Sequence, residues 1–135
     1  MLKLSKSTEY ALFALKYLAN NSNGNSISTK EISDSMNIPY NLLAKIMQKL
    51  VRHKIIKSQY GKTGGYSINV PPKNLSLKDI INAVDQKLQI TDCMYEGATE
   101  NDCMRLNKCE IRNPLHKIQN KLINVLHSTN LEELI

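Results

Sequence analysis

Residues 28–70 read STKEISDSMNIPYNLLAKIMQKLVRHKIIKSQYGKTGGYSINV, and this stretch decides the fold. Ser28 and Glu31 have the spacing of a capping box, in which a hydroxyl and a carboxylate each satisfy a free backbone N–H. A short helix is therefore expected from this point. Asn37-Ile38-Pro39 ends it and starts another helix, because proline is tolerated in a first helical turn. The stretch predicts two helices joined by a tight turn.

The second of these helices, expected to run to about His53, has two unlike faces. Its apolar residues follow the i, i+3, i+4, i+7 spacing of a core-facing stripe, namely Leu43, Ile46, Met47 and Leu50. The opposite face carries amides and bases, with Asn41, Lys45, Gln48 and Arg52 in a row and Lys49 alongside. A short helix, a tight turn and a helix with such an outer face are typical of a helix-turn-helix.

Two β-prone runs follow, residues 55–60 and 66–70, joined by the glycine-rich link 61–65. This pattern predicts a hairpin, and a hairpin directly after a recognition helix is the wing of a winged helix. The link is no Walker loop, because its glycines follow Lys62-Thr63 and a strand comes next. Since a nucleophile elbow and a close carboxylate pair are also missing, the chain is not expected to be an enzyme.

The remaining elements are helices over residues 7–20, 77–84 and 114–127, the second of them capped by Ser76 and Asp79. The last helix has a narrow apolar seam suited to a partner helix, formed by Leu115, Ile118, Leu122 and Val125. The expected fold class is mainly α with a small β-hairpin wing, a winged helix-turn-helix plus a long C-terminal dimerisation helix. The expected division is 1–85 for DNA binding, 86–113 for a cysteine-containing loop, and 114–135 for dimerisation and the tail.

The charge is distributed unevenly. The net charge of +6 divides into +8 for residues 1–80 and −2 for residues 81–135, and residues 35–78 contain no Asp or Glu. A basic half attracts polyanions by counterion release, and amides and bases can read base edges or bind phosphate. We therefore expect a double-stranded DNA partner. The candidate contacts are Tyr40, Asn41, Lys45, Gln48, Lys49 and Arg52 on the helix, and Lys57, Tyr60, Lys62 and Thr63 on the wing.

Three cysteines, Cys93, Cys103 and Cys109, are clustered in a turn-rich segment. No export signal and no apolar stretch of membrane length is found, so we expect a cytoplasmic protein with no membrane partner and with reduced thiols. The odd, clustered thiols favour an iron–sulfur cluster, with a thiol switch and a zinc site as alternatives. The three histidines, His53, His116 and His127, are weaker ligand candidates.

The chain resembles the IscR/NsrR-type family of bacterial winged-helix regulators, the Rrf2 family. The resemblance rests on residues 6–11 as the first helix, 38–50 as the recognition helix, 61–66 as the wing, 80–85 as the post-wing helix and 129–134 as the ending. It implies a homodimer whose long C-terminal helices pair and present two recognition helices to a palindromic operator. It also implies that the three cysteines hold an iron–sulfur cluster, of two or four irons.

The resemblance bears on the fourth cluster ligand as well. IscR-like members use a His three residues after the last Cys, where this chain has Arg112, which cannot ligate. NsrR-like members use an acidic residue of the first helix, and Glu9 matches that position. The resemblance therefore implies Glu9, from the partner subunit, as the fourth ligand. The interval from Cys93 to Cys103 exceeds the usual first gap of the family.

The function expected from these features is a dimeric DNA-binding transcription regulator, a repressor type, that senses iron–sulfur status, nitric oxide or redox state through its cluster. One alternative is a small iron–sulfur electron-transfer or carrier protein whose basic surface docks on an acidic partner. Another is a cluster-free regulator of the same fold with a thiol switch.

Overall fold

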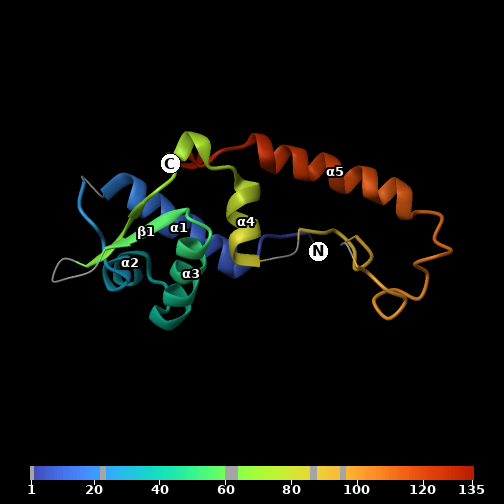
Figure 1. The fold of residues 1–135 in the computed structure, drawn as a ribbon, viewed down its shortest axis with the longest axis horizontal. Helices are drawn as coiled ribbons and strands as arrows, with labels where there is room; N and C mark the ends of the chain where they lie inside the picture. The colour runs from blue at the N-terminus through green and yellow to red at the C-terminus, as the bar shows by residue number, and fades with distance from the viewer. Residues whose placement is uncertain (1, 22–23, 60–63, 86–87, 95–96) are drawn as a thin grey trace.

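The computed structural model describes residues 2–21, 24–59, 64–85, 88–94 and 97–135. The elements in chain order are α1 (Lys6–Asn21), α2 (Thr29–Met36), α3 (Tyr40–Arg52), β1 (Ile56–Gln59), β2 (Gly65–Ile68), the 3-10 turn η1 (Pro72–Asn74), α4 (Leu77–Asp85), α5 (Arg112–Ser128) and the 3-10 turn η2 (Leu131–Leu134). Figure 1 shows a body made of α1–α4 and the hairpin, from which α5 extends to one side.

One hydrophobic core joins α1, α3 and α4. Leu15, Leu43, Leu50 and Ile80 are each fully buried in it, which confirms the apolar stripe of the second helix of the pair. Full burial of one such side chain contributes about 1.5–3 kcal/mol. The C-terminal turn η2 returns to this core, since Leu131 is fully buried and its N–H donates to the carbonyl of Leu75 at 2.8 Å.

The predicted cap at Ser76 is complete, since Ser76 and Asp79 cap each other with bonds of 3.1 and 3.3 Å. At Ser28 the hydroxyl half of the predicted capping box is formed, because Ser28 Oγ accepts from Glu31 N at 3.1 Å, whereas Glu31 Oε1 accepts from the hydroxyl of Tyr17 at 3.0 Å. Asn37 ends α2 in the left-handed conformation, with φ 54°. Pro39 is the N-cap of α3 rather than a residue of its first turn, so α3 begins one residue later than the proline.

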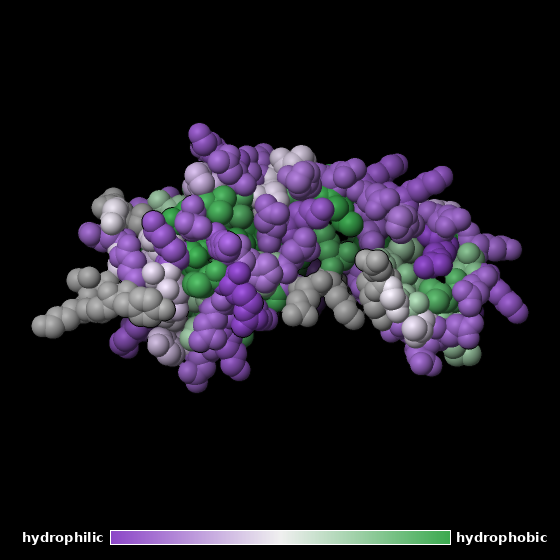
Figure 2. Space-filling view, viewed as in Figure 1, coloured by the Kyte–Doolittle hydropathy of each residue, from purple (hydrophilic) through white to green (hydrophobic). Residues whose placement is uncertain are grey.

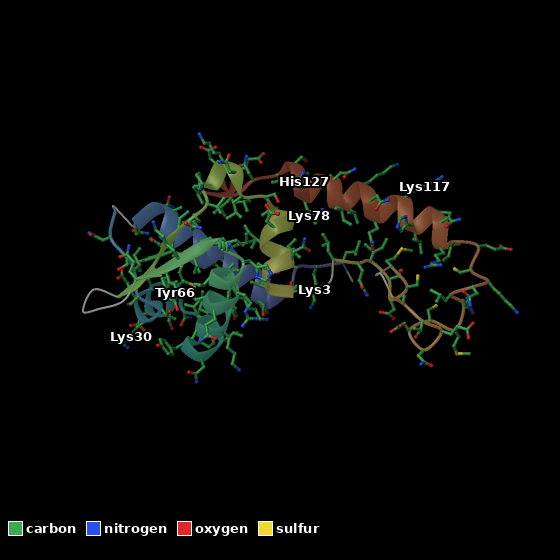
Figure 3. All side chains as sticks on the ribbon, viewed as in Figure 1. Lys3, Lys30, Tyr66, Lys78, Lys117 and His127 are labelled. Atoms are coloured by element: carbon green, nitrogen blue, oxygen red, sulfur yellow. The ribbon has the colours of Figure 1, made fainter. Side chains whose placement is uncertain are left out.

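The hairpin is antiparallel, with Ile56 opposite Ile68 and Gln59 opposite Gly65. β2 also pairs with the chain just before α2, because Ile27 N donates to Tyr66 O at 2.9 Å and Tyr66 N to Ile27 O at 2.7 Å. Figure 3 places Tyr66 on the hairpin near α2, the helix that carries Lys30. The hairpin is thereby fixed against the body. Residues 60–63, which include part of the predicted wing, lie outside the described residues.

Helix α5 begins at Arg112, two residues before the predicted start at Pro114. The proline occupies the third helical position, where a backbone N–H has no partner within the helix, so its missing N–H costs little. Figure 1 shows the cysteine segment looping under the N-terminal end of α5. In Figure 2 hydrophobic residues line the hollow between the cysteine segment and the body.

Candidate functional site

The outer face of α3 is open to solvent along its length. Asn41, Lys45, Gln48 and Arg52 are all exposed, and Tyr40 at the start of the helix is 53% exposed. Lys57, on β1, is exposed as well. The structure thus brings the helix candidates into one polar, basic face. The wing candidates Tyr60, Lys62 and Thr63 lie outside the described residues.

Two side chains next to that face, Lys49 and His53, are hydrogen-bonded to backbone carbonyls. Lys49 is half-buried and its Nζ donates to the carbonyl of Val84 at 3.1 Å, at the C-terminal end of α4. A cation is stabilised at that position because the last carbonyls of a helix have no partner within the helix. His53 Nδ1 lies 3.0 Å from the carbonyl of Lys49, which requires a donating N–H on that nitrogen. His53 therefore caps α3.

The three cysteines line one open cavity of about 470 Å³ beside the start of α5. Cys93 is buried, and Cys103 and Cys109 are half-buried. Thr91 Oγ1 lies 3.3 Å from Cys93 Sγ, within hydrogen-bond reach of the thiol. The three thiols that the sequence singles out, from positions up to sixteen residues apart, therefore line the same cavity.

Cations surround this cavity. Among the described residues, Arg105, Lys108 and Arg112 line it together with one carboxylate, Glu110. Such a lining favours an anionic occupant. Arg112 cannot ligate a metal, but its positive charge lies where it can stabilise an anionic group in the cavity.

The lining fits an iron–sulfur cluster in its chemistry, since thiolates are the ligands that such clusters use and the bound cluster carries negative charge. The ligand set is not drawn together, however. Among the residues that the structure describes, no group of three His, Cys, Asp or Glu side chains is close enough to hold a metal ion. Binding would require the segment to contract around the group.

Glu9 lies apart from the cysteine cavity of its own chain. Its carboxylate accepts from Lys6 Nζ at 2.9 Å on the surface of α1, beside Phe13 and Leu134. The hydrogen bond and the charge of Glu9 raise the pKa of Lys6 above its usual value. One chain alone therefore does not bring Glu9 to the thiols. His116 and His127 are exposed on α5 and line no part of that cavity.

A family model described as Rrf2, iron-dependent transcriptional regulator, matches residues 4–135. The chain belongs to the Rrf2 family. Among its relatives are the protein aau3 of Rhizobium meliloti, 27% identical over 99% of this chain and 85% of the relative, and the transcriptional regulator NsrR of Bacillus licheniformis, 24% identical over 99% and 92%. The structure of CymR, the global cysteine regulator of B. subtilis, is similar with a TM-score of 0.76, 25% identity, and coverage of 99% and 96%.

Membership of the Rrf2 family confirms the winged-helix fold and a DNA-binding transcription regulator that is not an enzyme. The electron-transfer alternative receives no support from these relatives, which are named as regulators. None of the helices that the structure describes is long and apolar enough to span a membrane.

Two features, the cations of the cysteine cavity and the buried Gln119 of α5, were not predicted from the sequence. The cations Arg105 and Lys108 lie in a half of the chain with a net negative charge, although their positions beside Cys103 and Cys109 are a usable signal. Gln119 is buried on α5, where we expected only an apolar seam. Its spacing to Ile123 and Leu126 places it in a second stripe of that helix.

Proposed function

We propose that this Rrf2 protein is a dimeric repressor-type regulator that binds a palindromic operator and senses iron–sulfur status, nitric oxide or redox state through an iron–sulfur cluster. The observation that carries the proposal is the cavity lined by Cys93, Cys103 and Cys109 under a rim of cations. The cavity lies on the segment that joins α4 to α5, and α4 contacts the recognition helix α3. A change at the thiols can therefore act on α4 and on α5.

The exposed face of α3 supports a base-reading role in the major groove. Asn41 and Gln48 are amides that can bond an adenine edge bidentately, and Lys45 and Arg52 can bond guanine or phosphate. Lys57 on β1, with the wing residues Tyr60, Lys62 and Thr63, is proposed to contact the DNA backbone. Lys49 would join them only if it left the carbonyl of Val84.

The exposed seam of α5 supports a homodimer. Ile118 is 48% exposed, Leu122 39% and Val125 60%, although they recur on one side of the helix. A continuous apolar side of this kind favours burial against a second copy. Two copies related by a two-fold axis would present two α3 helices to half-sites about one helical turn apart.

Cys93, Cys103 and Cys109 would supply three thiolates to the cluster, and Glu9 of the partner subunit is the proposed fourth ligand. The cluster would supply a group that oxidants, nitric oxide or iron shortage can alter. Arg105, Lys108 and Arg112 would stabilise its negative charge. Before it could ligate, Glu9 would have to leave the ion pair with Lys6.

A second function, a cluster-free thiol switch, is favoured by one observation, the similarity to CymR, the global cysteine regulator of B. subtilis. In that case oxidation of a thiol in the cationic cavity would replace cluster loss as the signal. The same segment would transmit it.

Anaerobic purification with iron and sulfide counts, an absorption spectrum and DNA-binding titrations separates these functions. Stoichiometric sulfide, with a loaded form and a cluster-free form that differ in DNA affinity, supports the cluster sensor. Glu9→Ala should then destabilise the cluster, whereas Glu31→Ala, at another exposed carboxylate of the body, should not. Protein without iron or sulfide, whose DNA affinity changes on thiol oxidation, supports the switch. Equal affinity in every state would overturn both.

A further inference from the structure

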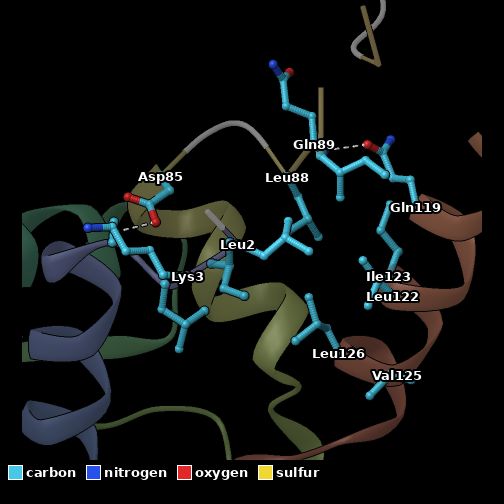
Figure 4. A pocket seen from close by; sticks show the side chains of 14 residues that line it. Leu2, Lys3, Asp85, Leu88, Gln89, Gln119, Leu122, Ile123, Val125 and Leu126 are labelled. Atoms are coloured by element: carbon cyan, nitrogen blue, oxygen red, sulfur yellow. Dashed lines mark hydrogen bonds between the residues drawn. The ribbon is translucent and has the colours of Figure 1, made fainter. Parts of the chain in front are cut away.

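Helix α5 buries an amide, whereas its seam residues Ile118, Leu122 and Val125 remain exposed. Gln119 is 5% exposed and is the one buried residue of this helix, all of which the structure describes. It lines a cavity of about 360 Å³ under α5 that is otherwise mainly apolar. Figure 4 shows this cavity, with Leu2, Leu88 and Leu126 from three segments facing it. A buried amide in such surroundings is costly unless both of its ends are hydrogen-bonded.

Both ends of Gln119 are bonded, and both partners are backbone atoms of the cysteine segment. Ile90 N donates to Oε1 at 2.9 Å, drawn in Figure 4, and Nε2 donates to the carbonyl of Met94 at 3.2 Å. Only a side chain with a donor and an acceptor of this length can make both bonds. A glutamate lacks the donor, and a methionine has no donor and only a weak sulfur acceptor.

The two partners bracket Cys93. Met94 N donates to Thr91 O at 3.2 Å, which closes a turn around this cysteine, and Thr91 Oγ1 lies 3.3 Å from its Sγ. Cys93 is 9% exposed, the least exposed of the three thiols. Gln119 therefore holds the turn that carries Cys93 at both of its ends.

We propose that Gln119 is a positioning residue that fixes the Cys93 turn to α5 and couples the state of Cys93 to that helix. The positioning of Cys93 is independent of the proposed function, whereas the role of the coupling in sensing rests on it. A shift of the Cys93 turn, whether from cluster binding or from thiol oxidation, must either carry α5 with it or break the two bonds of Gln119. Because α5 carries the dimer seam, either event alters how two α3 helices are spaced.

The first arm of the test uses the cluster-free, reduced protein. Native-state alkylation by iodoacetamide, mapped by mass spectrometry, gives a rate for each cysteine. In Gln119→Met the rate at Cys93 should rise roughly five- to thirtyfold, the factor expected for losing one or two hydrogen bonds. The rates at Cys103 and Cys109 should stay within about twofold. Asn120→Met, a change at an exposed amide of the same helix, should alter none of them.

Gln119→Glu keeps the bond to Ile90 N and loses the bond to Met94 O, so it should give an intermediate rate at Cys93. It also tests the proposal if the methionine variant does not fold, as judged by circular dichroism. A Cys93 rate equal to that of the wild type in a folded Gln119 variant overturns the proposal, and so does an equal rise at all three thiols.

The second arm uses the loaded or oxidised protein. In Gln119→Met the ratio of DNA affinities between the two states of the thiols should fall toward one, while the affinity of the reduced, cluster-free form stays within about twofold. If the wild type shows no such ratio, the proposed sensing fails. The alkylation arm still decides whether Gln119 positions Cys93.

Discussion

Thr8 Oγ1 donates a hydrogen bond of 2.5 Å to Asp85 Oδ2, and this bond fixes the first turn of α1 to the last residue of α4. Ser5 Oγ donates to the same oxygen at 2.6 Å and accepts from Thr8 N at 3.0 Å. Thr8 is 1% exposed. The carboxylate therefore anchors the point from which the chain leaves the winged-helix body toward the cysteines.

Replacing this carboxylate should destabilise the body. In Asp85→Ala the buried hydroxyl of Thr8 loses its acceptor, which costs about 1–3 kcal/mol. Urea unfolding followed by circular dichroism measures the loss. Asp34→Ala removes an exposed carboxylate that pairs with Lys30 at 3.6 Å, and it should change the stability by less than about 0.5 kcal/mol. Equal losses in the two variants would contradict the anchoring role of Asp85.

Gly65 is required by the close approach of β2 to the chain before α2. A Cβ at this position would lie 2.5 Å from the carbonyl carbon and oxygen of Ile27 and 2.9 Å from Ser28 N, all backbone atoms. Gly65→Ala should therefore cost about 1–3 kcal/mol of stability, because the paired backbone must move apart. Thermal unfolding checks this value.

The control for this change is Ser67→Ala on the same strand. Ser67 Oγ is buried and has no hydrogen-bond partner among the described residues, so its removal should be neutral or slightly stabilising. A loss at Ser67 as large as that at Gly65 would mean that β2 tolerates no change at all, and the steric explanation would fail.

The sequence predicts those parts of the molecule that depend on neighbours along the chain. The caps at Ser28 and Ser76 and the apolar stripe from Leu43 to Leu50 follow from spacing alone, and the structure confirms them. The glycine-rich link predicts a hairpin, although the reason for Gly65 lies in a backbone contact with Ile27.

Contacts between distant segments escape prediction when one partner is a backbone atom. Lys49 binds the Val84 carbonyl, and Gln119 binds backbone atoms of Ile90 and Met94. Because any residue type supplies these backbone atoms, the sequence gives no sign of the partners. The clustering of the three cysteines is visible in the sequence, whereas the cations that line their cavity depend on how the segment folds back on α5.

The DNA binding that we propose for α3 should depend on salt in a way that identifies phosphate contacts. With a generic duplex, Arg52→Ala should lower the slope of log affinity against log salt by about one, because one fewer counterion is released. Lys117→Ala, on exposed α5, should leave the slope unchanged (Figure 3). Fluorescence anisotropy across a salt series measures both. Equal slopes for Arg52→Ala and the wild type would remove Arg52 from the interface.

The proposed dimer seam on α5 gives the last prediction. In the single chain Ile118 is 48% exposed, so Ile118→Asp should leave the folding of the monomer nearly unchanged. In a dimer the same carboxylate would be buried without a partner, which costs about 3 kcal/mol or more, or at least about a hundredfold in the dimer dissociation constant. Sedimentation velocity over a concentration series measures that constant. Asn120→Asp adds the same charge on an exposed position of α5 and should leave the dimer intact. A wild type that sediments as a monomer, or a variant that dimerises as tightly as the wild type, would show that this seam is not the contact between two copies.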